Sequence, residues 1–171
     1  MVFIGCDPGK GGAIAWIEAN NNSPSVDVVN MPETDSELWS LIEDKFNYHD
    51  HAHIFSRAII ERVSAGGVRT GEGKARMGAT SAFTFGQQVG RLHMALTAAG
   101  IPYDVATPRR WQKELGCMSG GDKHVCKRRA EQLFPSVRVT LRNCDSLLIA
   151  EYCRRVFSNN TTPCATRDLT E

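Results

Sequence analysis

The chain has 171 residues and a net charge of +1, with 42% hydrophobic and 23% charged residues, which is typical of a globular domain and excludes a disordered chain. No apolar run approaches the roughly 20 residues that span a membrane, and the start of the chain lacks the charged and apolar regions of a signal peptide. We therefore expect a protein that has no membrane span, is not secreted and remains in the compartment where it is made.

Three short strands are expected in the first part of the chain. A β-branched and aromatic run at 2–4 leads into a glycine turn at 7–12, and a second such run follows at 13–17. Residues 26–31 alternate between apolar and polar side chains, which is typical of a strand. We predict three consecutive antiparallel strands.

A helix and a buried strand are expected next. Thr34 and Glu37 have the spacing of a capping box, which predicts a helix over 36–47. The apolar run 58–60 predicts a buried strand, and Glu61 stands at its end.

The second half of the chain is predicted to be mostly helical. Residues 64–79 are rich in glycine and basic side chains and should form a flexible loop, which leads into a long helix over 80–100. A short strand follows at 103–106, and a helix opens at Pro108 because proline is favoured in the first helical turn. The last two helices are expected over 122–134 and 143–157.

These elements predict one α/β domain over 1–157, with strands of both directions in its sheet. A polar tail over 158–171 is expected to be flexible. The six cysteines contain no C-x-x-C pair and fall in apolar or helical segments, so we expect buried free thiols rather than disulfides or a zinc cluster.

Charge is distributed unevenly along the chain. Residues 1–60 contain three Lys/Arg and nine Asp/Glu, whereas residues 107–155 contain eleven and five. A nucleic-acid surface on one half of the domain would produce this asymmetry, and so would a solvated basic helix face. Charge alone leaves both interpretations open.

Three acidic residues stand at the ends of predicted elements beside apolar neighbours. Asp7 ends the first strand, Glu61 ends a central strand, and Asp145 opens the last helix. A carboxylate with apolar neighbours is unfavourable unless it has a partner, and a divalent cation is a common one. Each acid also has a simpler explanation: a turn, an ion pair with a neighbouring arginine, or a helix N-cap. The recurrence of acids at element ends favours a metal site suited to phosphoryl chemistry.

The motifs of the chain, in their order, resemble those of the RuvC-like Holliday junction resolvases, especially the compact phage, bacterial and chloroplast forms. The resemblance rests on the first strand with its aspartate, the strand with its glutamate, a middle segment, a basic helix ending in Leu-Phe-Pro and a last acidic motif. These motifs lie at 4–12, 59–61, 85–92, 100–103, 107–112, 123–135 and 144–150. They cover nearly the whole chain.

The resemblance implies an RNase H-like fold, a mixed five-stranded sheet flanked by helices, and the activity of a crossover junction endodeoxyribonuclease. Such an enzyme is a homodimer that makes symmetric, metal-dependent nicks in four-way branched DNA during recombination and repair. Asp7, Glu61 and Asp145 would bind two Mg²⁺ ions, with Mn²⁺ able to substitute, and no small-molecule cofactor is expected. The protein would act in the cytoplasm, or in the interior of an organelle or host where DNA is present.

Basic and aromatic side chains are the expected DNA contacts. Lys123 and Lys127 share a helix face four residues apart, so we expect them to hold the scissile phosphate and to act in catalysis. The other predicted DNA-binding residues are Arg69, Lys74, Arg76, Phe83, Phe85, Arg128 and Arg129, of which the two phenylalanines would stack at the junction centre. A solvated helix face and ordinary core packing stay open as alternatives. Gly86 and Gly90 permit close helix approach, either at a dimer seam or within the chain.

One position departs from the RuvC-like pattern. Such enzymes usually carry a further acid, or a histidine, shortly before the last aspartate, where this chain has Arg142 and Asn143. The carbonyl of Asn143, or Glu151, remains as a substitute ligand. The altered site leaves a catalytically weak junction-binding protein as one alternative, and a nuclease for flap or hybrid substrates as another. A sugar-kinase or actin-like ATPase would need a second domain.

Overall fold

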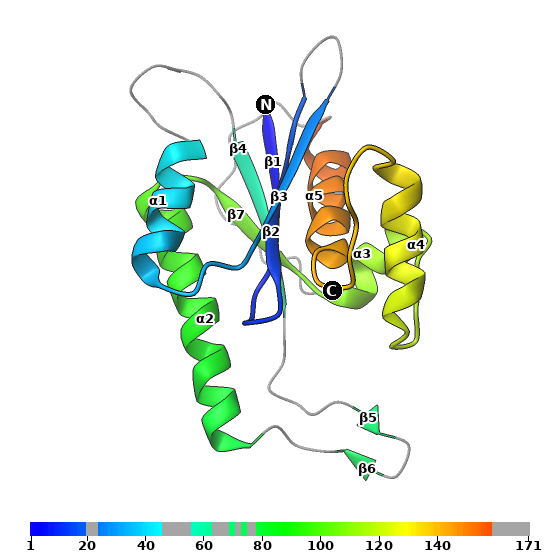
Figure 1. The fold of residues 1–171 in the computed structure, drawn as a ribbon, viewed down its shortest axis with the longest axis horizontal. Coiled ribbons are helices and arrows are strands. Elements are labelled where there is room, and N and C mark those ends of the chain that lie inside the picture. The colour runs from blue at the N-terminus through cyan, green and yellow to red at the C-terminus, as the bar shows by residue number, and fades with distance from the viewer. Residues whose placement is uncertain (20–23, 46–55, 63–68, 71–72, 75–77, 159–171) are drawn as a thin grey trace.

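The computed structural model describes residues 1–19, 24–45, 56–62, 69–70, 73–74 and 78–158 (Figure 1). Within these ranges, no helix has the length and apolar character needed to cross a membrane. The five cysteines in this part of the chain are buried free thiols, as predicted. Cys164 and the tail beyond Ser158 lie outside the described residues.

A mixed five-stranded sheet forms the centre of the molecule, as the resemblance implies. Its strands are β1 (Val2–Asp7), β2 (Ala13–Glu18), β3 (Ser25–Asn30), β4 (Ser56–Glu61) and β7 (Tyr103–Ala106). They lie in the order β3-β2-β1-β4-β7. The first three strands pair antiparallel, whereas β4 pairs in parallel with both β1 and β7. The unbroken apolar run of β1 is explained by its central position, since helices cover both of its faces.

Helices cover both faces of the sheet (Figure 1). On one face lie α1 (Asp35–Lys45) and α2 (Ala79–Ala98), and on the other lie α3 (Pro108–Glu114), α4 (Lys123–Leu133) and α5 (Cys144–Phe157). Because side chains alternate along a strand, each strand contributes to both apolar layers. Phe3 and Ile59 belong to the layer beneath α5, whereas Ile4 and Ile60 belong to the layer beneath α1 and α2.

Strand β1 and helix α5 approach each other closely at Gly5. A Cβ atom on Gly5 would lie 2.1 Å from the backbone nitrogen of Ala150 and 2.3 Å from the carbonyl oxygen of Ser146. Only a residue without a side chain allows this contact. The facing residues of α5, Ser146 and Ala150, are also small. The contact brings the first turn of α5 to the end of β1.

Side-chain caps fix the starts of two helices. The predicted capping box before α1 is confirmed: the backbone N–H of Glu37 donates to Thr34 Oγ1 at 3.1 Å, and the N–H of Thr34 donates to Glu37 Oε2 at 3.0 Å. Asp122 caps α4 by accepting a hydrogen bond from the backbone N–H of His124 at 2.9 Å. This cap makes Lys123 the first residue of α4.

The three helices predicted after the strand at 103–106 are present as α3, α4 and α5, and glycines with positive φ at 116, 120 and 121 separate α3 from α4. The predicted loop at 64–79 differs from the structure. In the described part of the predicted loop 64–79, β5 (Arg69–Thr70) pairs with β6 (Gly73–Lys74). Strands of two residues are too short to produce a recognisable alternation in the sequence.

Gly5→Ala should destabilise the protein by at least about 2 kcal/mol, because its Cβ would meet helix backbone that cannot move without repacking the core. Gly11→Ala is the matched control, since a Cβ there meets no atom within 4 Å. Denaturant unfolding of both variants measures the difference. Equal stability of the Gly5 variant and the wild type would contradict the close contact.

Candidate active site

Asp7 and Glu61 lie at the ends of neighbouring parallel strands. The register of β1 and β4 sets Gly5 opposite Ile59, so Asp7 and Glu61 stand two residues further along each strand. Residues two apart on a strand point to the same face of the sheet. Gly5 faces α5, and Ile59 packs in the layer beneath α5. Both carboxylates therefore belong to the α5 face.

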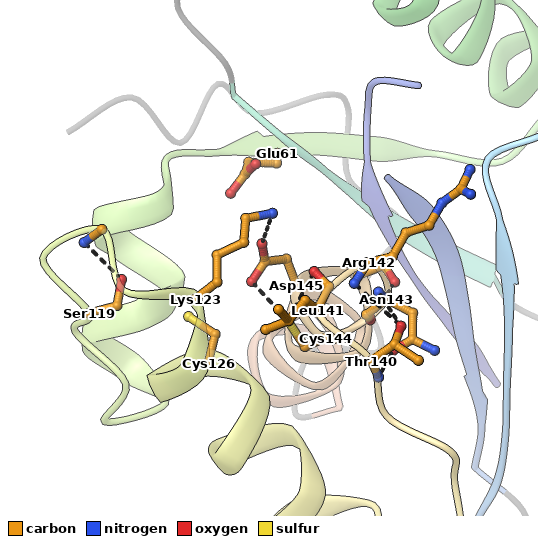
Figure 2. A network of polar contacts seen from close by, with 12 residues as sticks. Glu61, Ser119, Lys123, Cys126, Thr140, Leu141, Arg142, Asn143, Cys144 and Asp145 are labelled. Carbon is orange, nitrogen blue, oxygen red and sulfur yellow. Dashed lines mark hydrogen bonds and ion pairs between the residues drawn. The ribbon is translucent and has the colours of Figure 1, made fainter. Parts of the chain in front are cut away.

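Asp145 reaches the same place from the helix side. It is the second residue of α5, only 8% exposed, and its Oδ2 lies 3.3 Å from Lys123 Nζ (Figure 2). Asn143 occupies the N-cap position of α5, so capping does not explain this acid. In Figure 2 the ammonium group of Lys123 lies on the side of Asp145 that faces Glu61.

Burial and mutual repulsion raise the pKa values of two of these acids. Burial, followed by the charge of Asp145, raises the pKa of Asp7 to about 7. Burial, followed by the charges of Asp7 and Asp145, raises the pKa of Glu61 to about 8. Burial alone would lower the pKa of Lys123, but the charges of Asp145 and Asp7 raise it. Three carboxylates and one lysine thus lie within electrostatic reach of one another.

The chemistry of this cluster fits a divalent cation. Its donors are carboxylate oxygens, which Mg²⁺ and Mn²⁺ prefer. Burial, and after it mutual repulsion, raises the pKa values of Asp7 and Glu61, and Lys123 only partly offsets this. In the described part of the chain, no three His, Cys, Asp or Glu side chains already converge closely enough to hold a metal ion. Cation binding would therefore require the side chains of Asp7, Glu61 and Asp145 to draw together.

The two residues considered as a fourth ligand have other polar partners in the structure. Asn143 uses both ends of its side-chain amide for backbone groups of the preceding loop, at 2.7 and 3.1 Å. Glu151 lies further along α5 and pairs with Arg154 and Arg155, at 2.7 and 2.9 Å. Both alternatives for a fourth ligand therefore have other partners in this structure.

The turn between β1 and β2 is held tightly beside Asp7. A Cβ atom on Gly12 would lie 2.0 Å from the carbonyl oxygen of Asp7, and the N–H of Gly12 donates to the carbonyl of Gly9 at 3.0 Å. Arg142 donates to the carbonyl oxygen of Lys10 at 3.0 Å. Arg142, which stands where RuvC-like enzymes usually carry a further acid, thus holds the turn that follows Asp7 through a hydrogen bond.

The basic residues of α4 have different partners. Lys123 contacts Asp145, whereas Lys127 pairs with Glu131 of its own helix at 2.8 Å. Arg129 donates to the backbone carbonyl at the C-cap of α3, at 2.8 Å, and so ties α4 to α3. Arg128 is exposed. The structure thus brings Lys123 to the carboxylates and shows Lys127 paired with an acid of α4.

The two phenylalanines predicted to contact DNA have different surroundings. Phe83 is 68% exposed on α2. Phe85 is half-buried, and its ring lies 3.3 Å from the position of a Cβ on Gly9, next to the β1–β2 turn. Of the predicted basic loop residues, Arg69 and Lys74 are described only as backbone partners in the β5–β6 pair, and Arg76 lies outside the described residues.

One contact of the site has no signal in the sequence. The indole Nε1 of Trp111 donates to Glu61 Oε1 at 3.1 Å. Trp111 falls within a motif of the family resemblance, but nothing local indicates that α3 directs this ring towards the end of β4.

The sheet order and the two helical layers give the chain an RNase H-like α/β fold. No protein-family model matches the sequence, and no curated protein matches it. Among solved structures, T. thermophilus RuvC in complex with a Holliday junction substrate matches with a TM-score of 0.57 and 14% identity, over 95% of this chain and 98% of that chain. A second structure of Thermus thermophilus RuvC matches with a TM-score of 0.51 and 15% identity, over 92% and 97%. The chain therefore has the fold of a RuvC-like Holliday junction resolvase.

Glu61→Gln should stabilise the metal-free protein at pH 8 but not at pH 5. The pKa of Glu61 rises from 4.5 to about 8 on folding, so between these values the folded state binds the extra proton and the wild type loses stability as pH rises. A neutral glutamine escapes this loss, which should be at least about 1 kcal/mol at pH 8. Denaturant unfolding with a chelator at both pH values measures the gain. A gain that is the same at pH 5 and pH 8 would contradict the raised pKa.

Proposed function

We propose that the protein is a Holliday junction resolvase, a structure-selective endonuclease that hydrolyses phosphodiester bonds of four-way branched DNA. The observation that carries the proposal is that Asp7, Glu61, Asp145 and Lys123 lie within electrostatic reach of one another at the end of the sheet. The fold supports the same proposal, because the RuvC that it matches was solved with a Holliday junction substrate. Paired carboxylates beside a basic group are suited to phosphoryl transfer.

Each member of the cluster has a distinct role in this proposal. Asp7, Glu61 and Asp145 would hold Mg²⁺, or Mn²⁺ in its place. When bound, the cation would supply Lewis-acid activation of water and neutralise charge at the scissile phosphate. Lys123 stands beside Asp145 and would donate to a phosphate oxygen. The resemblance implies two ions; a titration with Mn²⁺ counts how many the three carboxylates bind.

The DNA surface would extend from the carboxylates along α4 and the segment between β4 and α2. Arg128 is exposed on α4 and would contact phosphates together with the neighbouring Lys127 and Arg129. Phe83 would stack on an unpaired base, while Phe85 would shape the floor beside the β1–β2 turn. The remaining proposed DNA contacts are Arg69, Lys74 and Arg76.

Helix α2 offers the surface for the proposed homodimer. Gly86, Gly90 and Met94 follow one another at intervals of four residues, which places them on one face of a helix. Met94 is 61% exposed, and a Cβ on either glycine would meet no atom within 4 Å. Within the described residues, no packing contact therefore requires glycine at position 86 or 90. A second copy of α2 could approach closely along this strip.

One observation favours a second candidate function, a junction-binding protein with weak catalysis. Arg142 stands where RuvC-like enzymes usually carry another acid, and it is engaged with the carbonyl of Lys10. Three carboxylates would hold cations less tightly than four. The cleavage rate of the wild type on a four-way junction separates this candidate from the resolvase.

Asp7→Asn and Glu61→Gln should each lower the rate of Mg²⁺-dependent junction cleavage at least about 100-fold, since each removes a charged metal ligand worth several kcal/mol of barrier. Junction binding should stay within about threefold of the wild type, because neither carboxylate contacts a phosphate directly. Asp27→Asn is the control, an acid that pairs with Lys45 on the far edge of the sheet. Cleavage and binding assays on four-way, flap and hybrid substrates measure both effects. Full cleavage by either variant would refute the proposed site.

The wild type should be a dimer that binds four-way junctions at least about tenfold more tightly than duplex DNA of equal length, a difference of about 1.4 kcal/mol, because a two-fold dimer engages two exchanging strands at once. Gly86→Arg should produce monomers and remove this preference. Ser81→Arg, an exposed position away from the strip, serves as the control. Sedimentation and binding assays measure both properties. A monomeric wild type with equal affinity for both DNAs would leave a nuclease but not a resolvase.

A further inference from the structure

Trp111 is a core residue with a polar contact at the candidate active site. It belongs to the first turns of α3, directly after β7, and its side chain is completely buried in the layer beneath α5. Its indole Nε1 donates to Glu61 Oε1 at 3.1 Å. Since β7 pairs with β4 up to Glu61, the turn from β7 into α3 brings this ring to the carboxylate.

The chemistry of the indole restricts what this contact can do. An indole N–H is a donor only, so it can occupy a lone pair of a carboxylate oxygen but can neither accept a proton nor bind a cation. The ring is enclosed by core side chains and has no room to follow a moving partner. The contact therefore holds the carboxylate of Glu61 in place, because the buried indole cannot move with it.

Glu61 needs such an anchor more than the other two acids. Glutamate has one more rotatable bond than aspartate and loses more side-chain freedom when it is ordered. Asp7 sits against a tight turn, and Asp145 is held by the start of α5 and by Lys123. For Glu61, the hydrogen bond from the buried indole of Trp111 takes this role.

We infer that Trp111 is a positioning residue, which holds Oε1 of Glu61 by a hydrogen bond so that Oε2 is presented to the divalent cation. This inference rests on the proposed function. Trp111 would contribute to cation affinity and to the rate of cleavage without touching DNA, cation or water.

The test replaces the N–H without changing the shape of the ring. 3-Benzothienylalanine at position 111 puts sulfur in place of the N–H, and the same substitution at Trp16 is the matched control, because Trp16 is buried in the opposite layer beneath α1 and α2. Substitution at position 111 should weaken Mn²⁺ binding about 10- to 100-fold, the usual effect of losing a hydrogen bond to a metal ligand. The cleavage rate should fall in parallel, with junction affinity unchanged. The control should match the wild type in all three measurements.

An unchanged Mn²⁺ affinity at position 111 would overturn the inference, because a purely structural role depends on ring shape and not on the N–H. The proposed function would survive that result if Asp7→Asn still abolished Mn²⁺ binding. Absence of Mn²⁺ binding and of cleavage in the wild type would instead refute both.

A second measurement observes the indole N–H directly in the wild-type protein. In ¹H–¹⁵N spectra, the indole resonance of Trp111 should shift on addition of Mg²⁺ at the concentration that saturates the site, while those of Trp16 and Trp39 stay in place. Trp111→Phe assigns the resonance. An indole resonance of Trp111 that does not move as Mg²⁺ saturates the protein would also overturn the inference.

Discussion

The contact between β1 and α5 at Gly5 determines the geometry of the candidate site. Because a Cβ there would lie 2.1 Å from helix backbone, the helix can rest directly on the strand only while this position is glycine. Two residues beyond Gly5 stands Asp7, and one residue before Ser146 stands Asp145. The close approach of strand and helix therefore also brings these two carboxylates within electrostatic reach of each other. Glycine at position 5 is therefore required both for the packing of α5 on β1 and for the arrangement of the two acids.

The close approach of β1 and α5 also makes the cluster of acids electrostatically unfavourable without a cation. Asp7 and Glu61 end adjacent parallel strands on one face, and their pKa values rise to about 7 and about 8. Lys123, placed by the cap of Asp122, compensates for part of the repulsion. A fold that holds three acids this close, against the preference of each for solvent, suits a site that gains stability when a divalent cation binds.

Most elements and the three acids could be predicted because their signals are local. A capping box, a glycine turn and an apolar run each occupy a few residues, and they identified Asp7, Glu61 and the start of α1. The contacts that could not be predicted join distant residues: Trp111 with Glu61, 50 residues apart, and Arg142 with Lys10, 132 apart. Helical spacing set Lys127 beside Lys123, but it carries no information about which acid each lysine meets.

If Asp7, Glu61 and Asp145 form one cation site, anomalous diffraction from crystals of the wild type soaked in Mn²⁺ will locate the ion directly. We expect an anomalous peak at the end of β1 and β4, within about 2.5 Å of oxygens of these carboxylates. The peak should disappear in Asp7→Asn crystals. A saturated crystal with no peak between β1, β4 and α5, and Lys123 still paired with Asp145, would contradict the proposed cation site.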